Sequence, residues 1–382
     1  MNDRIFISGT GLYHPEHAVS NEALVQSYNA YVEHYNDAHA KAIEAGELEP
    51  LKASNPRFIE KVSGIKSRYL MDAEHVLDPN SMQPSFAPRK DDEMSIQAEM
   101  AIAAAKRALD NANKSAEDID MIIVACSNFQ RAYPAISIEV QQALGAKGFA
   151  FDMNVACSSA TFAIAQAYSA IKTGLAKTAL LINPEICSAH LNFRNRDSHF
   201  IFGDACTATI VECENTLSKQ DDLFEIVDTR LTTQFSNNIR NNFGFLTRVE
   251  SDVQADLGLI YTSKYLFEQL GRRVFKDVVP LVSSMIVEHL KANGLSPEQV
   301  KRFWLHQANA HMNELIAEKI LGRKPSADEA PIILDEFGNT SSPGCLIAFH
   351  RYHNDLAVDD YGLLSSFGAG YSAGNILVKK VA

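Results

Sequence analysis

An internal repeat constrains the fold of this chain more than any other sequence feature. Residues 113–126 read NKSAEDIDMIIVAC and residues 292–305 read ANGLSPEQVKRFWL. In each case a long helix-prone segment comes first, and an acidic capping turn then opens an apolar strand. A second repeated motif lies near the end of each half: FGDA at 202–205 and FGAG at 367–370. Each is followed by a short apolar strand. The two similarities could be a coincidence, because such turns are common. Both repeated motifs occur in the same order in the two halves, however, which favours a duplication.

Strands alternate with helices along most of the chain, which is typical of an α/β fold. We expect helices over 94–112 and 137–144, and strands over 5–11, 119–127, 151–155, 178–183 and 208–211. Residues 21–62 read as an inserted helical segment, 72–92 as an inserted loop, and 214–262 as a connection with further loops. The expected halves are residues 1–215 and 216–382. Packed together, they would form a duplicated five-layer α/β/α/β/α fold with a site between them.

Composition excludes several classes of function. The chain has 382 residues, of which 46% are hydrophobic and 21% charged, and its net charge is −12. This acidity argues against general binding to nucleic acid or to an anionic membrane. We find no signal-peptide pattern and no run approaching the ~20 apolar residues of a membrane helix, so we expect a cytoplasmic protein. The six cysteines are scattered without a C-x-x-C pair, which predicts neither a disulfide framework nor a metal site.

Cys157 stands at the most informative junction in the chain. It follows the apolar run 151–155, expected to be a buried strand, and precedes a largely apolar helix over 158–173 that Gly174 should end. Free backbone N–H groups and the positive end of a helix meet at such a junction. We therefore expect the thiol to ionise more easily and to act as a nucleophile. The competing interpretation is an ordinary buried cysteine, which is the commoner case.

Two further polar residues follow predicted strands or turns in the second half. His306 comes after the apolar run 303–305, and Asn339 lies in a glycine-containing turn before a predicted helix over 345–353. Each alone reads as a structural histidine or a turn residue. With Cys157 they form a possible Cys-His-Asn set. A papain-like protease has the same residue types, but there the cysteine lies near the mature N-terminus in a different motif, so this interpretation fails.

Four motifs in order resemble the β-ketoacyl-acyl-carrier-protein synthase III family, which has the thiolase fold. They are ACSS at 156–159, HQAN at 306–309, GNTSS at 338–342 and FGAGYSAG at 367–374. The resemblance covers essentially the whole chain. Its Cys-His-Asn set differs from the Cys-His-His of elongating ketosynthases. Thiolases carry a second catalytic cysteine, and Cys345 does not stand in that setting.

The resemblance implies a decarboxylating Claisen condensation of an acyl-CoA with malonyl-acyl-carrier-protein, with no cofactor. Cys157 would hold the acyl group, while the backbone N–H groups of Cys157 and Ala369 would bind the thioester oxyanion. The Nε2 of a neutral His306 and the amide of Asn339 would stabilise the enolate left by decarboxylation. The resemblance assigns further aromatic residues to the substrate tunnel and its gate: Phe367, Tyr133, Phe202 and Phe275.

The same resemblance points to two kinds of protein partner. Arg272, Arg273 and Lys276 match a helix that docks the acyl carrier protein, although a solvated helix face is an equally plausible interpretation. Tyr133 resembles a loop residue that reaches into the tunnel of a neighbouring subunit, so we expect a homodimer.

Some residues depart from the family pattern. Phe58 replaces a tryptophan that stacks on the adenine of CoA, Val62 replaces an arginine, and His311 stands where an arginine is common. Segments 21–57, 72–92 and 229–262 are longer than in housekeeping members. We therefore expect a specialised member, one that uses a medium-chain acyl primer or serves secondary metabolism.

Two other functions compete with the condensation. The first is transfer of the Cys157-bound acyl group to an oxygen or nitrogen nucleophile. The second is a non-catalytic partner subunit of a ketosynthase, against which the presence of Cys157 counts.

Overall fold

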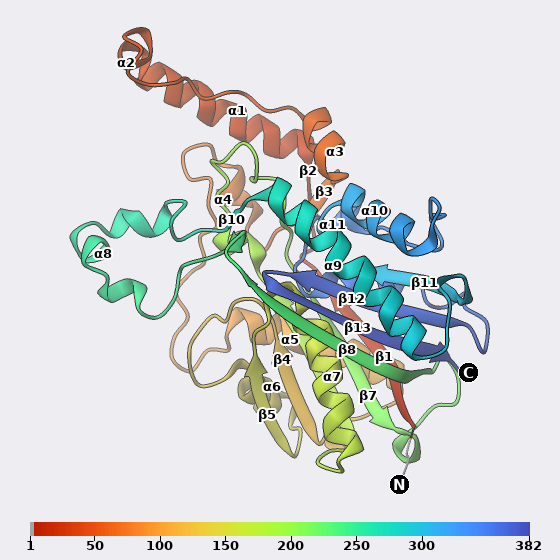
Figure 1. Cartoon of the computed structure of the whole chain (residues 1–382). Coiled ribbons are helices and arrows are strands. Elements are labelled where there is room, and N and C mark those ends of the chain that lie inside the picture. The colour runs from red at the N-terminus through yellow and green to blue at the C-terminus, as the bar shows by residue number, and fades with distance from the viewer. Residues whose placement is uncertain (1–3) are drawn as a thin grey trace.

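The computed structural model describes residues 4–382, within which the main strands form one nine-stranded mixed sheet made of two half-sheets (Figure 1). The first half contributes β1 (Ile5–Tyr13), β4 (Met121–Ala125), β5 (Phe149–Met153), β6 (Thr178–Glu185) and β7 (Ala205–Cys213). The second contributes β8 (Phe224–Ser236), β11 (Val300–Leu305), β12 (Tyr361–Gly368) and β13 (Gly370–Lys380). The halves join where β1 pairs with β8 in antiparallel register.

The duplication is visible in the order and direction of the strands. The first half runs β4-β6-β7-β1 and the second runs β11-β12-β13-β8, and in each the first pair is parallel and the next two pairs are antiparallel. Both predicted capping turns form short 3₁₀ helices, at Ala116–Asp118 and Pro297–Gln299, each with a capping box. The repeat in the sequence therefore corresponds to a repeat in the structure.

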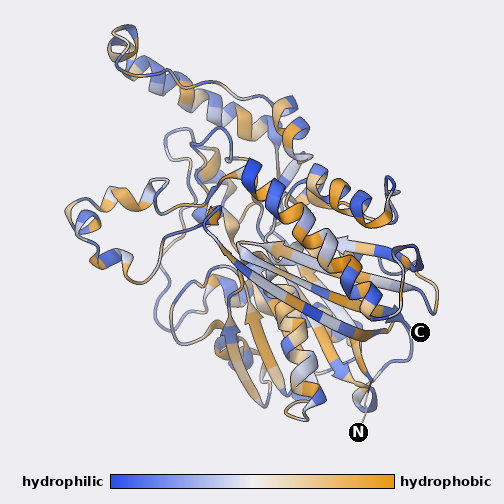
Figure 2. Ribbon diagram, in the orientation of Figure 1, coloured by the Kyte–Doolittle hydropathy of each residue, from blue (hydrophilic) through white to orange (hydrophobic). Residues whose placement is uncertain are grey.

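Helices complete the five expected layers. The middle layer consists of α7 (Ser159–Lys172) and α12 (Pro343–Arg351), each of which contacts strands of both halves. The outer layer of the first half is α5 (Ile96–Ala112) with α6 (Ile136–Leu144). That of the second half is α9 (Gly271–Ala292) with α10 (Ala310–Leu321). In Figure 2 the outer helix α9 alternates hydrophilic and hydrophobic residues, whereas the enclosed α7 is largely pale or orange.

Additional segments cluster at one end of the sheet. Residues 21–62, predicted to be helical, form α1 (Asn21–Ala38), α2 (Ala40–Glu44) and most of α3 (Pro56–Ser63), and α1 and α2 project from the body (Figure 1). The short strands β2 (Ala18–Ser20) and β3 (Ser67–Tyr69) pair at the base of this arm. The segment 72–92 holds the short helix α4 (Ala73–Leu77), followed by loop.

The remaining short elements are two strands and two helices of the second half. The strands β9 (Ile239–Arg240) and β10 (Glu268–Gln269) pair with each other on either side of an irregular stretch that contains α8 (Ser251–Ala255). The helix α11 (Leu334–Phe337) precedes the Asn339 turn. Along residues 4–382, none of the helices combines the length and the apolar character needed to cross a membrane.

Two expectations are wrong. The strand before Cys157 is not buried, because β5 forms the outer edge of the sheet and leaves Phe149 and Phe151 exposed. The stretch 214–262 is not only connection and loop, because it includes the 13-residue strand β8. Much of β8 is polar and only its first residues are well buried, so its sequence lacks the apolar run by which the other strands were found.

Candidate active site

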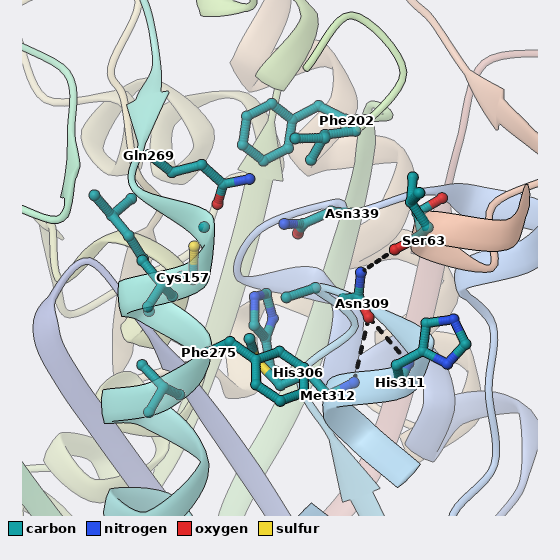
Figure 3. A pocket seen from close by; sticks show the side chains of 18 of the residues that line it. Ser63, Cys157, Phe202, Gln269, Phe275, His306, Asn309, His311, Met312 and Asn339 are labelled. Atoms are coloured by element: carbon teal, nitrogen blue, oxygen red, sulfur yellow. Dashed lines mark hydrogen bonds between the residues drawn. The ribbon is translucent and has the colours of Figure 1, made fainter. Parts of the chain in front are cut away.

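Cys157, His306 and Asn339 line one cavity of about 670 Å³ (Figure 3). They come from three separate junctions: the turn after β5, the end of β11, and the turn before α12. Side chains of α3, α9 and α10 form the surrounding walls. The geometry therefore brings together the three residue types that the sequence singled out.

A strained turn presents Cys157 to the cavity. The residue lies in the 3₁₀ turn Ala156–Ser158, two residues before α7 begins at Ser159. Ala156 has a φ of +48°, a left-handed conformation that costs a non-glycine residue roughly 1–2 kcal/mol. Opposite the thiol, a Cβ on Gly368 would lie 2.6 Å from the Cys157 Cβ and 2.9 Å from its sulfur. A glycine is required at 368 because the thiol occupies that space.

The expectation of an easily ionised thiol is wrong for the unliganded protein. Burial raises the pKa of Cys157 to about 11, and the negative charge of Glu185 acts in the same direction. Hydrogen bonds from the Ser341 hydroxyl and from the backbone N–H groups of Ala369 and Cys157 lower the pKa, but they do not compensate for burial. Desolvation thus outweighs the donors at the helix entrance, and the thiol is neutral at pH 7.

Backbone hydrogen bonds fix Asn339 in place. It forms an isolated parallel bridge with Phe202, in which Asn339 N donates to Ile201 O at 2.9 Å and Gly203 N donates to Asn339 O at 3.1 Å. The neighbouring glycines, Gly203 and Gly338, permit this close approach, since a Cβ on Gly203 would lie 2.1 Å from the Phe337 carbonyl oxygen. The FGDA motif of the first half therefore supports a site residue of the second.

His306 is held in an environment that keeps it uncharged. Its backbone N–H donates to Ser365 O at 2.7 Å, which continues the pairing of β11 with β12. Burial lowers the pKa of the imidazole to about 4, and a hydrogen bond with the Ser341 backbone opposes that shift. The ring packs edge-on against Phe367, with centroids 5.2 Å apart. At pH 7 the imidazole is neutral and carries a single N–H.

Two site residues were not identified from the sequence. Ser341 places its hydroxyl 3.5 Å from the Cys157 sulfur. Glu185 ends β6 as a carboxylate that is only 1% exposed, and it accepts hydrogen bonds from Ser127 and Ser342. The sequence contained features that could have identified both residues. Ser341 belongs to the GNTSS motif, and Glu185 is a charged residue at the end of an otherwise uncharged strand.

The predicted tunnel residues divide into two groups. Phe202, Phe275 and Phe367 line the cavity, as expected. Tyr133 does not line it, because its side chain is 85% exposed on a surface loop. Cys345 is buried within α12 and also lies away from the cavity lining.

The residues that depart from the family pattern lie at the cavity mouth. Phe58, Val62 and His311 all line it, and the Arg196 guanidinium lies over the Phe58 ring at 4.3 Å from its centroid. His311 approaches α3, with its Nε2 2.9 Å from the Lys61 carbonyl oxygen. The Phe58 ring at the mouth therefore already stacks with a guanidinium from outside the cavity lining.

The three predicted docking cations stand together in the first two turns of α9, beside the mouth. Arg272, Arg273 and Lys276 are exposed, and Arg272 also lines the cavity. Within residues 4–382 none of them makes an ion pair at 4.0 Å or less with an acidic side chain. Cations near a helix N-terminus are electrostatically unfavourable. The presence of these three residues is therefore not explained by a stabilising effect on α9.

Comparison with known proteins identifies the family. The family models for 3-oxoacyl-[acyl-carrier-protein (ACP)] synthase III and for its C-terminal part match residues 151–233 and 290–380. The chain is 58% identical over 93% of its length to a beta-ketodecanoyl-[acyl-carrier-protein] synthase of Pseudomonas aeruginosa, all of which it covers. It is 32% identical over 73% of its length to a beta-ketoacyl-[acyl-carrier-protein] synthase III of Bartonella bacilliformis, of which it covers 83%.

Solved structures agree with the family match. The 3-oxoacyl-[acyl-carrier-protein] synthase III of Aquifex aeolicus superimposes with a TM-score of 0.74 at 26% identity, over 98% of this chain and 99% of that one. The thiolase-like fold and the decarboxylating condensation predicted from the motifs are confirmed at the level of the family. The chain belongs to the 3-oxoacyl-[acyl-carrier-protein] synthase III family of condensing enzymes.

Proposed function

We propose that the protein condenses a medium-chain acyl thioester with malonyl-acyl-carrier-protein, with Cys157 as the acyl carrier. The observation that carries this proposal is the convergence of Cys157, His306 and Asn339 on one largely apolar cavity. The 58% identical relative is named for a ketodecanoyl product. A malonyl donor adds two carbons after losing carbon dioxide, so a ten-carbon product corresponds to an eight-carbon primer.

The first half-reaction is acyl transfer to the enzyme. The Cys157 sulfur attacks the thioester carbonyl, and the carbonyl oxygen becomes an oxyanion. The backbone N–H groups of Cys157 and Ala369 both point toward the sulfur, as their effect on its pKa indicates, and are suited to bind that oxyanion. One such donor is typically worth about 3 kcal/mol of transition-state stabilisation.

The second half-reaction is decarboxylation and carbon–carbon bond formation. Loss of carbon dioxide leaves negative charge on the malonyl thioester oxygen, where two neutral donors are suitable. The neutral His306 imidazole supplies one N–H. Asn339 supplies the other, since its Oδ1 already accepts from Ser341 N at 2.9 Å and its amide N–H groups remain available. The carbanion then attacks the acyl group on Cys157.

Carrier-protein docking is proposed for the start of α9. An acyl carrier of acidic character would find three cations there, Arg272, Arg273 and Lys276, on a chain whose net charge is −12. Because Arg272 lines the cavity, a thioester arm on a carrier bound at this position would enter beside the mouth.

A homodimer is also proposed. The strand β5 is one of the two edges of the sheet and exposes the stacked rings of Phe149 and Phe151. An exposed apolar strand edge is a surface that proteins normally cover. Tyr133 lies on the loop between β4 and α6 and is exposed for contact with a second copy.

One experiment tests the condensation. The enzyme is incubated with octanoyl-CoA and malonyl-acyl-carrier-protein, and the release of carbon dioxide is measured. The mass of the intact protein is determined by mass spectrometry, and a Cys157→Ala variant serves as the control. We expect an octanoyl adduct on Cys157, carbon dioxide release and a ten-carbon ketoacyl product. An adduct without carbon dioxide release would indicate acyl transfer to another nucleophile. An adduct that persists in Cys157→Ala would remove Cys157 from the mechanism.

A further inference from the structure

The turn that carries Ala369 has little rigidity of its own. Ala369 stands between Gly368 and Gly370, and glycine restricts the backbone less than any other residue. The turn nevertheless lies directly against the nucleophile, because a Cβ on Gly368 would be 2.9 Å from the Cys157 sulfur. A group that binds a reacting atom must be held to within about 0.5 Å. Contacts from outside the turn must therefore fix Ala369.

The two residues after the turn provide such contacts on opposite faces of the sheet. Ser372 Oγ lies 2.9 Å from Ala369 O and 2.9 Å from Ser158 Oγ, next to the start of α7 in the middle layer. Tyr371 points the other way, as alternate residues of a strand do, and packs into the apolar cluster beneath α9. Its side chain is only 3% exposed. The turn is thus held to the middle layer by Ser372 and to the outer layer by Tyr371.

The Tyr371 hydroxyl belongs to a closed set of three hydrogen bonds. It donates to Asp277 Oδ2 at 3.1 Å and accepts from Asn238 Nδ2 at 2.8 Å. Asn238 Nδ2 also donates to Asp277 Oδ2 at 3.1 Å. The single hydroxyl proton and the two amide protons are enough for all three bonds, so none of them competes with another. The three side chains therefore fix one another's positions.

Both partners of Tyr371 are tied to α9. Asp277 lies on this helix, one turn after Arg273. Asn238 accepts at its carbonyl oxygen from the backbone N–H of Leu270, the N-cap residue of α9, at 2.8 Å. The hydrogen bonds of Tyr371 therefore connect the helix proposed for carrier docking to the turn beside the nucleophile.

We propose that Tyr371 is a positioning residue for acyl transfer: its hydroxyl, held by Asp277 and Asn238, fixes the turn from which the Ala369 N–H binds the thioester oxyanion. Tyr371 lies outside the lining of the cavity that contains Cys157, so it acts through Ala369 and not on the substrate. The inference rests on the acyl-Cys157 intermediate and on the role of Ala369 proposed above.

The hydroxyl should matter for acylation and not for decarboxylation. Acylation builds an oxyanion at the carbon attacked by Cys157, whereas decarboxylation places charge on the malonyl oxygen, for which His306 and Asn339 are the proposed donors. Rapid mixing with octanoyl-CoA, followed by intact mass spectrometry, measures acylation. Carbon dioxide release from saturating malonyl-acyl-carrier-protein, mixed with enzyme that has already been acylated, measures decarboxylation.

Tyr371→Phe keeps the ring and removes only the hydroxyl. We expect acylation to slow about 10-fold, less than the 100-fold or more that follows complete loss of an oxyanion donor, while decarboxylation stays near the wild-type rate. Asp277→Ala should slow acylation to the same extent. Asp277→Asn should acylate close to the wild-type rate, because an amide oxygen still accepts from the hydroxyl. The matched control is Tyr265→Phe, which removes a 2.7 Å hydrogen bond to Glu250 from another buried tyrosine and should acylate normally.

The double variant Tyr371→Phe, Asp277→Ala should be no slower than either single variant, because both changes remove the same bond. Losses that add would show that the two residues act separately and would overturn the proposal. Wild-type acylation in Tyr371→Phe would also overturn it, as would equal losses in both half-reactions, which would indicate a general loosening of the site. If Tyr371→Phe does not fold, Asp277→Ala decides by the same two measurements. A failure of the condensation itself would appear in the wild-type enzyme, as the absence of an octanoyl adduct or of carbon dioxide release.

Discussion

The backbone N–H of Ser341 donates to Oδ1 of Asn339 at 2.9 Å, and this bond decides which end of the carboxamide remains free. With the oxygen engaged inside its own turn, the amide N–H groups remain for a ligand. An amide held in this way is a donor at any pH, because it does not titrate.

Asn339→Asp should therefore lose decarboxylation while keeping acylation. The aspartate can accept the same bond from Ser341, but it offers no N–H and places negative charge where an enolate must form. We expect carbon dioxide release from malonyl-acyl-carrier-protein to fall at least 100-fold, as for loss of an oxyanion donor, with Cys157 acylation near the wild-type rate. Asn309→Asp, which can still cap α10, controls for a new charge in the cavity. Equal losses in the two variants would contradict the role given to Asn339.

The substitution Gly368→Ala should displace the Cys157 thiol by steric overlap alone. The added Cβ would lie 2.6 Å from the Cys157 Cβ and 2.9 Å from its sulfur, so the thiol must move away from Ala369 and Ser341. We expect the acylation rate to fall more than 10-fold and the free energy of unfolding to drop by roughly 1–3 kcal/mol from overpacking. The control is Gly244→Ala, whose Cβ would meet no atom within 4 Å. Intact mass spectrometry over time and urea melts provide the two measurements.

The sequence predicted the elements with strong apolar patterns and the residues carried by the four motifs. The helices at 94–112 and 137–144 formed within two residues of the expected bounds, as α5 and α6. Strand β8 escaped prediction because its place between β13 and β1 is set by backbone pairing, whereas its polar side chains hide the strand period.

Charge states could not be read from the sequence. Cys157 follows a motif that suggests an activated thiol, but the amount of burial decides its pKa, and burial depends on contacts with Gly368 and Ser341 from distant parts of the chain. The same holds for Glu185, whose hydroxyl partners are separated from it by 58 and 157 residues. Such long-range contacts leave no local signature.

The buried imidazole of His306 should extend activity to acidic pH. Its pKa of about 4 keeps it neutral, and able to donate a single N–H, through the range in which an exposed histidine becomes charged. We expect the decarboxylation rate of the pre-acylated enzyme to stay nearly constant from pH 8 to pH 5 and to fall as pH approaches 4. A decline centred near pH 6.5 would show that the imidazole titrates as if exposed.

The same shift makes folding depend on pH. In the unfolded chain the imidazole has a pKa near 6.5, so between pH 6.5 and pH 4 the unfolded state binds more protons than the folded state. The stability contribution is full above pH 6.5 and is lost as pH falls, by about 2 kcal/mol at pH 5. Urea melts at pH 7 and pH 5 should therefore show a smaller loss for His306→Gln than for the wild type. An equal loss in both proteins would contradict the shift.

Reversing the charges on α9 should weaken docking without touching the chemistry. Arg273 and Lys276 are exposed and, among residues 4–382, neither forms a salt bridge, so Arg273→Glu with Lys276→Glu removes no such pair. Both side chains lie outside the cavity lining, and glutamate in the first two turns of a helix is favoured by the helix dipole. We expect the KM for malonyl-acyl-carrier-protein to rise about 10-fold or more and to lose most of its salt dependence, while kcat changes little.

Acylation by octanoyl-CoA, which does not involve the carrier protein, provides the internal comparison for the α9 double variant. Acylation of Cys157 by octanoyl-CoA should proceed at the wild-type rate in the double variant, because the cavity-lining residues Phe58 and Arg272 are unchanged. Lys106→Glu reverses one exposed cation on α5, in the other half of the molecule, and so controls for a charge reversal away from α9 at half the change in net charge. If Lys106→Glu raised the KM for the carrier protein as much as the α9 variant does, the attraction would come from overall charge and not from a docking surface on α9. The ratio of the two KM changes, measured at low and at physiological salt, therefore decides whether α9 binds the carrier.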